Sequence, residues 1–158
     1  MKPQDEPATT AGTAQVAPRI AAGSTRFALE VRPSPIHRYG VYVVEPVPAG
    51  SRVIEYDGER ISYREAARRS RSSLVYLFWA APGRIIDGAV GGSGAEFVNH
   101  SCEPNLVVKI EDGRAYFISL REIAADEELL LDYRIHGDAP HMVCRCGSAR
   151  CRGSLNAS

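Results

Sequence analysis

The stretch from Glu96 to Asn105, which reads E-F-V-N-H-S-C-E-P-N, constrains the fold of this chain more than any other stretch. The apolar pair Phe97 and Val98 leads into a cluster of hydrogen-bonding side chains, one potential metal ligand and a proline that stiffens the turn. A polar cluster directly after an apolar run indicates a strand that ends in a functional site. The sequence therefore predicts a site built around residues 99–105.

The composition indicates a single domain without a dominant charge. Of the 158 residues, 44% are hydrophobic, and 19 basic side chains balance 19 acidic ones. Because no basic excess is present, direct nucleic-acid binding is not expected. Residues 1–15 contain no apolar run of signal-peptide length, and no window approaches the length of a membrane span. We therefore expect a soluble, intracellular protein that does not associate with membranes.

Short apolar runs separated by turn residues predict a mainly β domain. Residues 1–24, rich in Ala, Thr, Pro and Gly, are expected to form a disordered tail. Ser62 and Glu65 fit a capping box, which predicts one short helix that ends near Ser70. The apolar run from residue 74 to Trp79 is expected to be buried. Strands are expected at 27–31, 41–44, 52–56, 85–87, 106–110, 115–120 and 129–131, with hairpin turns at 57–58 and 111–114.

The cysteines predict a metal site. Three of them follow the pattern C-x-C-x4-C, at Cys144, Cys146 and Cys151. The remaining one is Cys102, so a site of four thiolates would use every cysteine and tie the tail to the central stretch. Zn²⁺ favours four thiolates in structural sites that are closed to water. Free thiols or disulfides are the alternatives, although two cysteines one residue apart pair poorly with each other.

Taken together, these segments resemble a SET-domain protein lysine methyltransferase with a post-SET cysteine segment. The resemblance rests on segments that follow the family's order between residues 26 and 153: 39–42, 53–59, 76–78, 86–87, 97–105, 128–133 and the cysteine tail. It implies a fold of small curved sheets in which 97–105 and 129–133 pack in a knot-like core. It also implies a SET domain over residues 25–136 and a post-SET zinc-binding tail over 137–158.

The resemblance implies a role for individual residues. It implies S-adenosylmethionine as the methyl donor and a lysine of a partner protein as the acceptor, with histones as the family's best-known substrate. Tyr133 matches the catalytic tyrosine, and Phe78 and Leu131 fall where the family binds the substrate lysine. The implied cofactor-binding residues are Tyr39, Gly40, Tyr76, Asn99 and His100. The implied ligands of a structural zinc ion are Cys102, Cys144, Cys146 and Cys151.

These residue types suit the attack of an amine on a sulfonium methyl. A lysine has a reference pKa of about 10.4, so the amine must first lose a proton. An apolar, aromatic channel disfavours the charged ammonium and lowers that pKa. Because the protein needs to supply little covalent help, alignment of the reactants provides much of the rate.

Two alternatives stay open from the sequence. Outside the motif, Tyr133, Tyr76 and Phe78 would be ordinary core aromatics. The chain also has Arg38 and Glu96 where family members usually have a glycine and an arginine. These departures motivate the alternative function, a non-catalytic SET-like module that binds a protein or peptide. Cofactor binding distinguishes the two, because a degenerate module should bind no S-adenosylmethionine.

Overall fold

The computed structural model describes residues 18–71, 74–136 and 139–157. Residues 1–17 of the expected disordered tail lie outside the described residues. Residues 18–24, which we also expected in that tail, instead lie against the domain. Ile20 packs on the core, and the N–H of Ala21 donates to the carbonyl of Ser93 over 2.9 Å. Within the described residues, no helix has the length and hydrophobicity that crossing a membrane requires.

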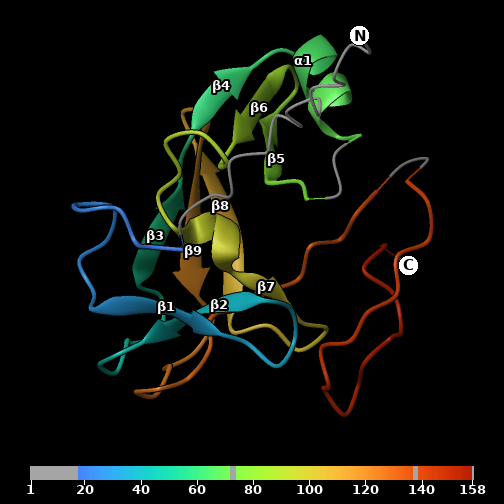
Figure 1. The fold of residues 1–158 in the computed structure, drawn as a ribbon. Helices are drawn as coiled ribbons and strands as arrows, with labels where there is room; N and C mark the ends of the chain where they lie inside the picture. Colours follow the sequence, from blue (N-terminus) through green and yellow to red (C-terminus); the bar gives the residue numbers. More distant parts are fainter. Residues whose placement is uncertain (1–17, 72–73, 137–138, 158) are drawn as a thin grey trace, which may run out of the picture.

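The described chain is mainly β, as predicted, and its strands form three small sheets (Figure 1). The first sheet pairs β1 (Leu29–Pro33) with β2 (Tyr39–Val43). The second has the order β3-β9-β8-β10-β7, with bounds Arg52–Tyr56, Arg114–Ser119, Leu106–Glu111, Leu130–Leu131 and Asn99–His100. The third has the order β4-β6-β5, with bounds Glu59–Ile61, Arg84–Asp87 and Leu77–Ala81.

The helices are short and lie at turns between strands. The helix α1 (Tyr63–Arg69) begins after Ser62, whose hydroxyl accepts a hydrogen bond from the N–H of Glu65 over 3.2 Å. This confirms the predicted capping box. A 3-10 helix, η1 (Ala95–Phe97), leads into β7. In Figure 1, α1 and the β4-β6-β5 sheet form one end of the molecule, β1 and β2 form the other, and the C-terminal segment runs along one side.

The two hairpin predictions have different outcomes. The β8–β9 hairpin is confirmed, and its turn residues Asp112 and Gly113 both have positive φ, 49° and 73°, as a two-residue type I′ turn requires. The hairpin at Asp57 and Gly58 is wrong, because β3 pairs with β9 and β4 pairs with β6. Glycine at position 58 instead lets the backbone of Asp87 approach closely, because a Cβ there would lie 2.7 Å from the carbonyl carbon of Asp87.

One hydrophobic core joins the three sheets. Its buried residues include Val43 on β2, Ile54 on β3 and Ile86 on β6, all at most 1% exposed. The expectation that the apolar run from residue 74 to Trp79 is buried is wrong for Val75 and Trp79, which are 44% and 55% exposed and not part of this core. Side chains alternate along a strand, so Phe78 and Ala80 on β5 face the core while Trp79 faces solvent.

The chain crosses itself near the β7 edge of the second sheet. The strand β10 lies between β7 and β8 and is parallel to both, although β7 and β8 are consecutive along the chain. The loop 101–105 that joins β7 to β8 therefore passes across β10. The side chain of Asn105, 1% exposed, holds this crossing, because it donates to the carbonyl of Glu128 and accepts from the N–H of Leu130, each over 2.8 Å. This is the knot-like core that the resemblance implied.

Candidate active site and metal centre

Tyr133 follows β10 directly and turns its hydroxyl back toward β7. The hydroxyl donates to the carbonyl of Val98 over 2.6 Å, and Val98 is 3% exposed. Burial raises the pKa of the Tyr133 phenol, and the nearby charges of Glu128 and Tyr76 raise it further. The residue as a whole is nevertheless 42% exposed. Tyr133 thus keeps a neutral hydroxyl pointed into the protein, while part of the residue stays exposed to solvent.

His100 connects the backbone of Tyr133 with a cysteine. Its Nδ1 accepts a hydrogen bond from the N–H of Tyr133 over 3.1 Å, so the ring proton lies on Nε2. That Nε2 faces the Sγ of Cys102 at 3.4 Å. Burial lowers the pKa of His100, although Asp132 opposes the shift, so the ring is neutral at physiological pH. His100 therefore holds the backbone at Tyr133 close to the loop that carries Cys102.

Asn99 is held by a carboxylate that the sequence-based prediction missed. Its Nδ2 donates to Oε1 of Glu128 and to the carbonyl of Tyr39, each over 2.8 Å. Oε2 of Glu128 also accepts from the hydroxyls of Ser34 and Tyr42, over 3.0 and 3.1 Å. The signal in the sequence was an acidic residue immediately before the core segment 129–131. Glu128 thereby joins the turn before β2, β2 itself and β7, two strands that carry four of the predicted cofactor residues.

The carboxylate of Glu128 also explains why residue 40 is a glycine. A Cβ added at Gly40 would lie 2.7 Å from Cδ of Glu128 and 3.1 Å from Cβ of Ser34. Both distances are too short for an ordinary contact. The absence of a side chain at position 40 therefore lets β2 pass directly beside Glu128.

The predicted aromatic site residues fall into two neighbouring groups. Tyr39 and Tyr76 both pack edge-on against Phe97, with ring centroids 6.4 and 5.8 Å away. Phe78 instead lies against Tyr56, with ring centroids 4.9 Å apart. The hydroxyl of Tyr56 donates to the carbonyl of Tyr76 over 2.6 Å and so connects the two groups.

Tyr56 was another residue without an assigned role. Burial raises its pKa well above the usual value, and the charges of Glu96 and Tyr133 contribute. Its position at the end of β3, next to Phe78, places it in the same aromatic group as a predicted substrate-binding residue. Leu131, by contrast, is 6% exposed and belongs to the core cluster on which Phe78 packs.

The two departures from the family pattern have local structural explanations. Arg38 adopts a φ of 43°, a left-handed conformation that glycine takes freely and other residues take at a cost of about 1–2 kcal/mol. Arg38 thus takes a backbone conformation that a glycine would adopt without strain. The carboxylate of Glu96 turns back onto its own loop and accepts from the N–H of Gly94 over 2.8 Å. Burial raises the pKa of Glu96, while the hydrogen bond from Gly94 and the more distant Arg19 partly oppose the shift.

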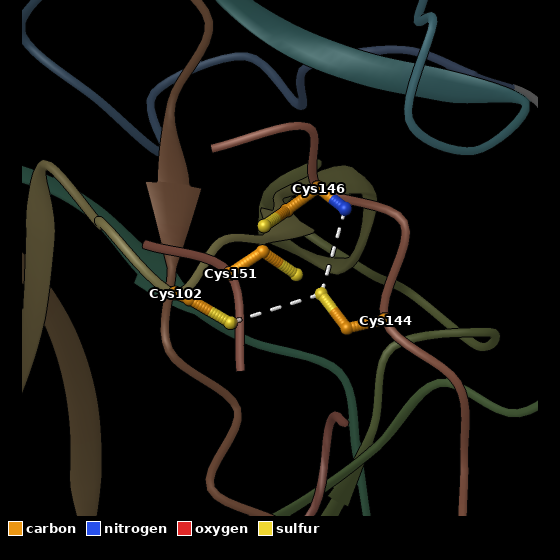
Figure 2. A group of neighbouring side chains, drawn as sticks. All are labelled: Cys102, Cys144, Cys146 and Cys151. Atoms are coloured by element: carbon orange, nitrogen blue, oxygen red, sulfur yellow. Dashed lines mark hydrogen bonds between the residues drawn. The ribbon is translucent and has the colours of Figure 1, made fainter. Parts of the chain in front are cut away.

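The four cysteines converge from two distant parts of the chain (Figure 2). Their sulfur atoms all lie within 4.8 Å of one another, and none forms a disulfide. Cys102 comes from the loop that crosses β10, and the other three come from the C-terminal segment. Figure 2 shows all four side chains pointing toward a common centre. The structure thus brings together the ligand set that the sequence predicted.

One sulfur–sulfur distance in this cluster matches that of a tetrahedral zinc site. A Zn–S bond of about 2.3 Å places two sulfurs of a regular tetrahedron about 3.8 Å apart, and the Cys102 and Cys144 sulfurs are 3.8 Å apart. Burial raises the pKa of the Cys144 thiol to about 12, and hydrogen bonds to the neighbouring thiols contribute. A dication held by these thiols would reverse this effect, because it would stabilise the thiolates directly.

Comparison with known proteins gives the same picture. Residues 38–134 match the SET domain family. The chain is 38% identical over 136 residues to a protein of Debaryomyces hansenii named "Histone-lysine N-methyltransferase, H3 lysine-4 specific". It is 39% identical over 132 residues to "Histone-lysine N-methyltransferase trithorax" of Drosophila virilis. A solved structure described as KRYPTONITE in complex with mCHG DNA and SAH matches 83% of the chain with a TM-score of 0.69 and 33% identity.

These matches cover most of this chain but a small part of the other proteins. The two named relatives each match 78% of this chain, which spans 12% of the Debaryomyces hansenii protein and 3% of the Drosophila virilis protein. The chain also spans 29% of the KRYPTONITE chain. The similarity therefore concerns one domain of much longer proteins.

Proposed function

The chain belongs to the SET-domain family, and from this premise we propose that it transfers methyl groups from S-adenosylmethionine to the side-chain amine of a lysine in a protein. One observation carries the proposal: the hydroxyl of Tyr133 is fixed on the carbonyl of Val98, next to the strand that bears Asn99 and His100. The bound donor would supply an electrophilic methyl on a sulfonium. The protein's task is then to align a neutral amine with that methyl.

The residues of the chain divide this task between them. Tyr39, Gly40, Tyr76, Asn99 and His100 are proposed to hold the donor, and the bonds from Asn99 to Glu128 and Tyr39 fix the shape of that surface. Phe78, with Tyr56 beside it, is proposed to wall the lysine channel, while Leu131 supports this wall from the core. Aromatic walls exclude water and favour the neutral amine. The phenol of Tyr133 is proposed to orient the amine, and burial raises its pKa, which favours the protonated form.

The cysteine cluster is proposed to hold a structural zinc ion through Cys102, Cys144, Cys146 and Cys151. With four thiolates, no position is left for water, so the ion serves folding. It ties the post-SET segment to the loop that crosses β10. Residues 25–136 and 137–158 would then act as one unit made of a SET domain and its zinc-bound tail.

The names of the relatives make histone H3 the first substrate to test, and they favour an intracellular site of action. The experiment is transfer of labelled methyl from S-adenosylmethionine, with zinc-loaded protein, to histones and to the proteins of a whole lysate. Tyr133→Phe serves as the matched control, because it removes the hydroxyl and keeps the ring. We expect label on lysine that falls by about 100-fold or more in the variant. Equal label in both proteins would contradict the role of Tyr133. Absence of both label and donor binding would support the non-catalytic module.

A further inference from the structure

The segment around Tyr133 is held by a second connection to the C-terminal tail, next to the cysteine cluster. Arg152 follows Cys151, and its guanidinium grips the carboxylate of Asp132 with two hydrogen bonds, of 3.0 and 2.7 Å. Both side chains are shielded, with 24% and 22% of their surfaces exposed. Such a two-bond pair fixes geometry as well as charge, because the planar guanidinium matches the carboxylate.

Further contacts hold Arg152 rigidly within the tail. Its Nε donates to the carbonyl of Asn156 over 3.1 Å, and its backbone N–H faces the Sγ of Cys102 at 3.4 Å. The segment after it then runs beside Ile135, whose N–H donates to the carbonyl of Leu155 over 3.2 Å. Because the guanidinium of Arg152 has this many partners, it has few alternative rotamers and holds Asp132 in one position.

Asp132 in turn shapes the backbone on both sides of Tyr133. Its Oδ1 accepts from the N–H of Arg134 over 3.2 Å, which closes a small turn across Tyr133. Arg134 has a φ of 44°, a left-handed conformation that costs energy unless its surroundings enforce it. The N–H of Tyr133 itself is held by His100. The direction of the Tyr133 side chain therefore depends on a turn whose central acceptor is anchored by Arg152.

We propose that Arg152 and Asp132 form a positioning pair that sets the direction of the Tyr133 hydroxyl, so that the post-SET tail contributes to catalysis by a route besides zinc. The consequence for the reaction rests on the proposed function, whereas the consequence for the backbone of residues 132–134 does not. Neither side chain needs to touch the substrate. Their loss should therefore lower kcat and leave KM nearly unchanged, because alignment in the transition state is lost and binding is not.

The test compares Arg152→Met with Arg150→Met, a matched control from the same loop. Arg150 also pairs with an acidic side chain, since its Nε donates to Glu103 over 2.8 Å, but the Arg150 side chain is 84% exposed and its partner belongs to the loop 101–105, not to residues 132–134. For Arg152→Met we expect kcat to fall by about 10- to 100-fold, with KM within a factor of about three and zinc still bound. Arg150→Met should stay within about twofold of the wild type, as exposed ion pairs contribute little.

Two further variants keep the proposal testable if Arg152→Met folds poorly. Arg152→Lys keeps the charge but cannot form the two parallel bonds, so it should fold and still lose part of kcat. Asp132→Asn keeps an acceptor for the N–H of Arg134 and loses the ion pair, so its kinetic loss should resemble that of Arg152→Lys. A kcat for Arg152→Lys equal to that of the wild type would overturn the proposal.

Hydrogen exchange supplies a readout that does not depend on activity. In zinc-loaded Arg152→Met, the amides of residues 132–134 should exchange about tenfold or more faster than in Arg150→Met. Unchanged exchange would overturn the pair's positioning role, and so would a loss of kcat that follows a loss of zinc in proportion. An inactive wild type with the expected exchange difference would refute the proposed function while retaining the positioning of the segment.

Discussion

Replacing Gly40 with alanine tests whether the carboxylate of Glu128 is the reason for glycine at this position. The added methyl would lie 2.7 Å from Cδ of Glu128, so the carboxylate must move. Gly40 itself cannot retreat easily, because β2 is paired with β1 along its whole length, with Gly40 opposite Arg32. The displaced carboxylate would lose its three hydrogen bonds, from Asn99, Ser34 and Tyr42.

The size of the effect follows from these contacts. Hydrogen bonds to a charged group contribute about 1.5–3 kcal/mol each, but Glu128 is half-buried and water replaces part of what is lost. About 0.5–1 kcal/mol for each of the three bonds, with about 1 kcal/mol for overpacking, gives a destabilisation of about 2.5–4 kcal/mol for Gly40→Ala. For a domain of this size the melting temperature should fall by about 6–12 °C.

A double-mutant cycle with Glu128→Ala makes the reasoning refutable. Glu128→Ala loses the same three bonds and should cost about 3 kcal/mol by itself. In that background the methyl at position 40 has room, so Gly40→Ala should cost less than about 1 kcal/mol. Urea unfolding of the four proteins in excess zinc measures both steps. If Gly40→Ala costs the same with and without Glu128, the steric argument is wrong.

Three other predictions concern the metal, a buried acid and the tryptophan. Removal of zinc by a strong chelator should lower the melting temperature by on the order of 10 °C and speed tryptic cleavage after Arg145 and Arg150. Cys146→Ser should have the same two effects without chelator. An unchanged cleavage pattern would argue against a tail that zinc holds to the domain. Burial raises the pKa of Glu96. In the pH range just above the usual pKa of a glutamate, the folded state therefore binds more protons than the unfolded state. The contribution of Glu96 to the free energy of unfolding falls as the pH rises through that range. Glu96→Gln should therefore raise the melting temperature at pH 7 and leave it unchanged near pH 4, and a rise that is equal at both pH values would contradict this. Trp79, the single tryptophan, should show solvent-exposed fluorescence that iodide quenches fully, whereas blue-shifted emission would place it in a core.

The cysteine spacing and the polar stretch after Phe97 carried most of the information about the site. The pattern C-x-C-x4-C with Cys102 identified a set of four sulfurs that the structure places within 4.8 Å of one another. Local rules also sufficed for α1 and for the β8–β9 hairpin, because caps and two-residue turns depend on neighbouring residues alone.

The predictions were less complete for features that depend on residues distant in the sequence. The turn at Gly58 follows the hairpin pattern, yet the strands on either side of it pair with β9 and β6, and no local signal distinguishes these outcomes. Trp79 was expected in the core because its neighbours are apolar, but the alternation of β5 turns it to solvent. Residues 18–24 carry no periodic pattern, and contacts with the loop before η1 order them.

The sequence by itself therefore determined the chemical groups: a tyrosine after a core strand, an asparagine–histidine pair, and a set of four cysteines. Only the tertiary structure decided which groups hold them in place. Glu128 against Gly40 and Arg152 against Asp132 are contacts across 88 and 20 positions of the chain, and no spacing rule predicts them. The physical reason is that a hydrogen bond between distant side chains depends on how the sheets pack, and β10 reaches its place only by passing between β7 and β8.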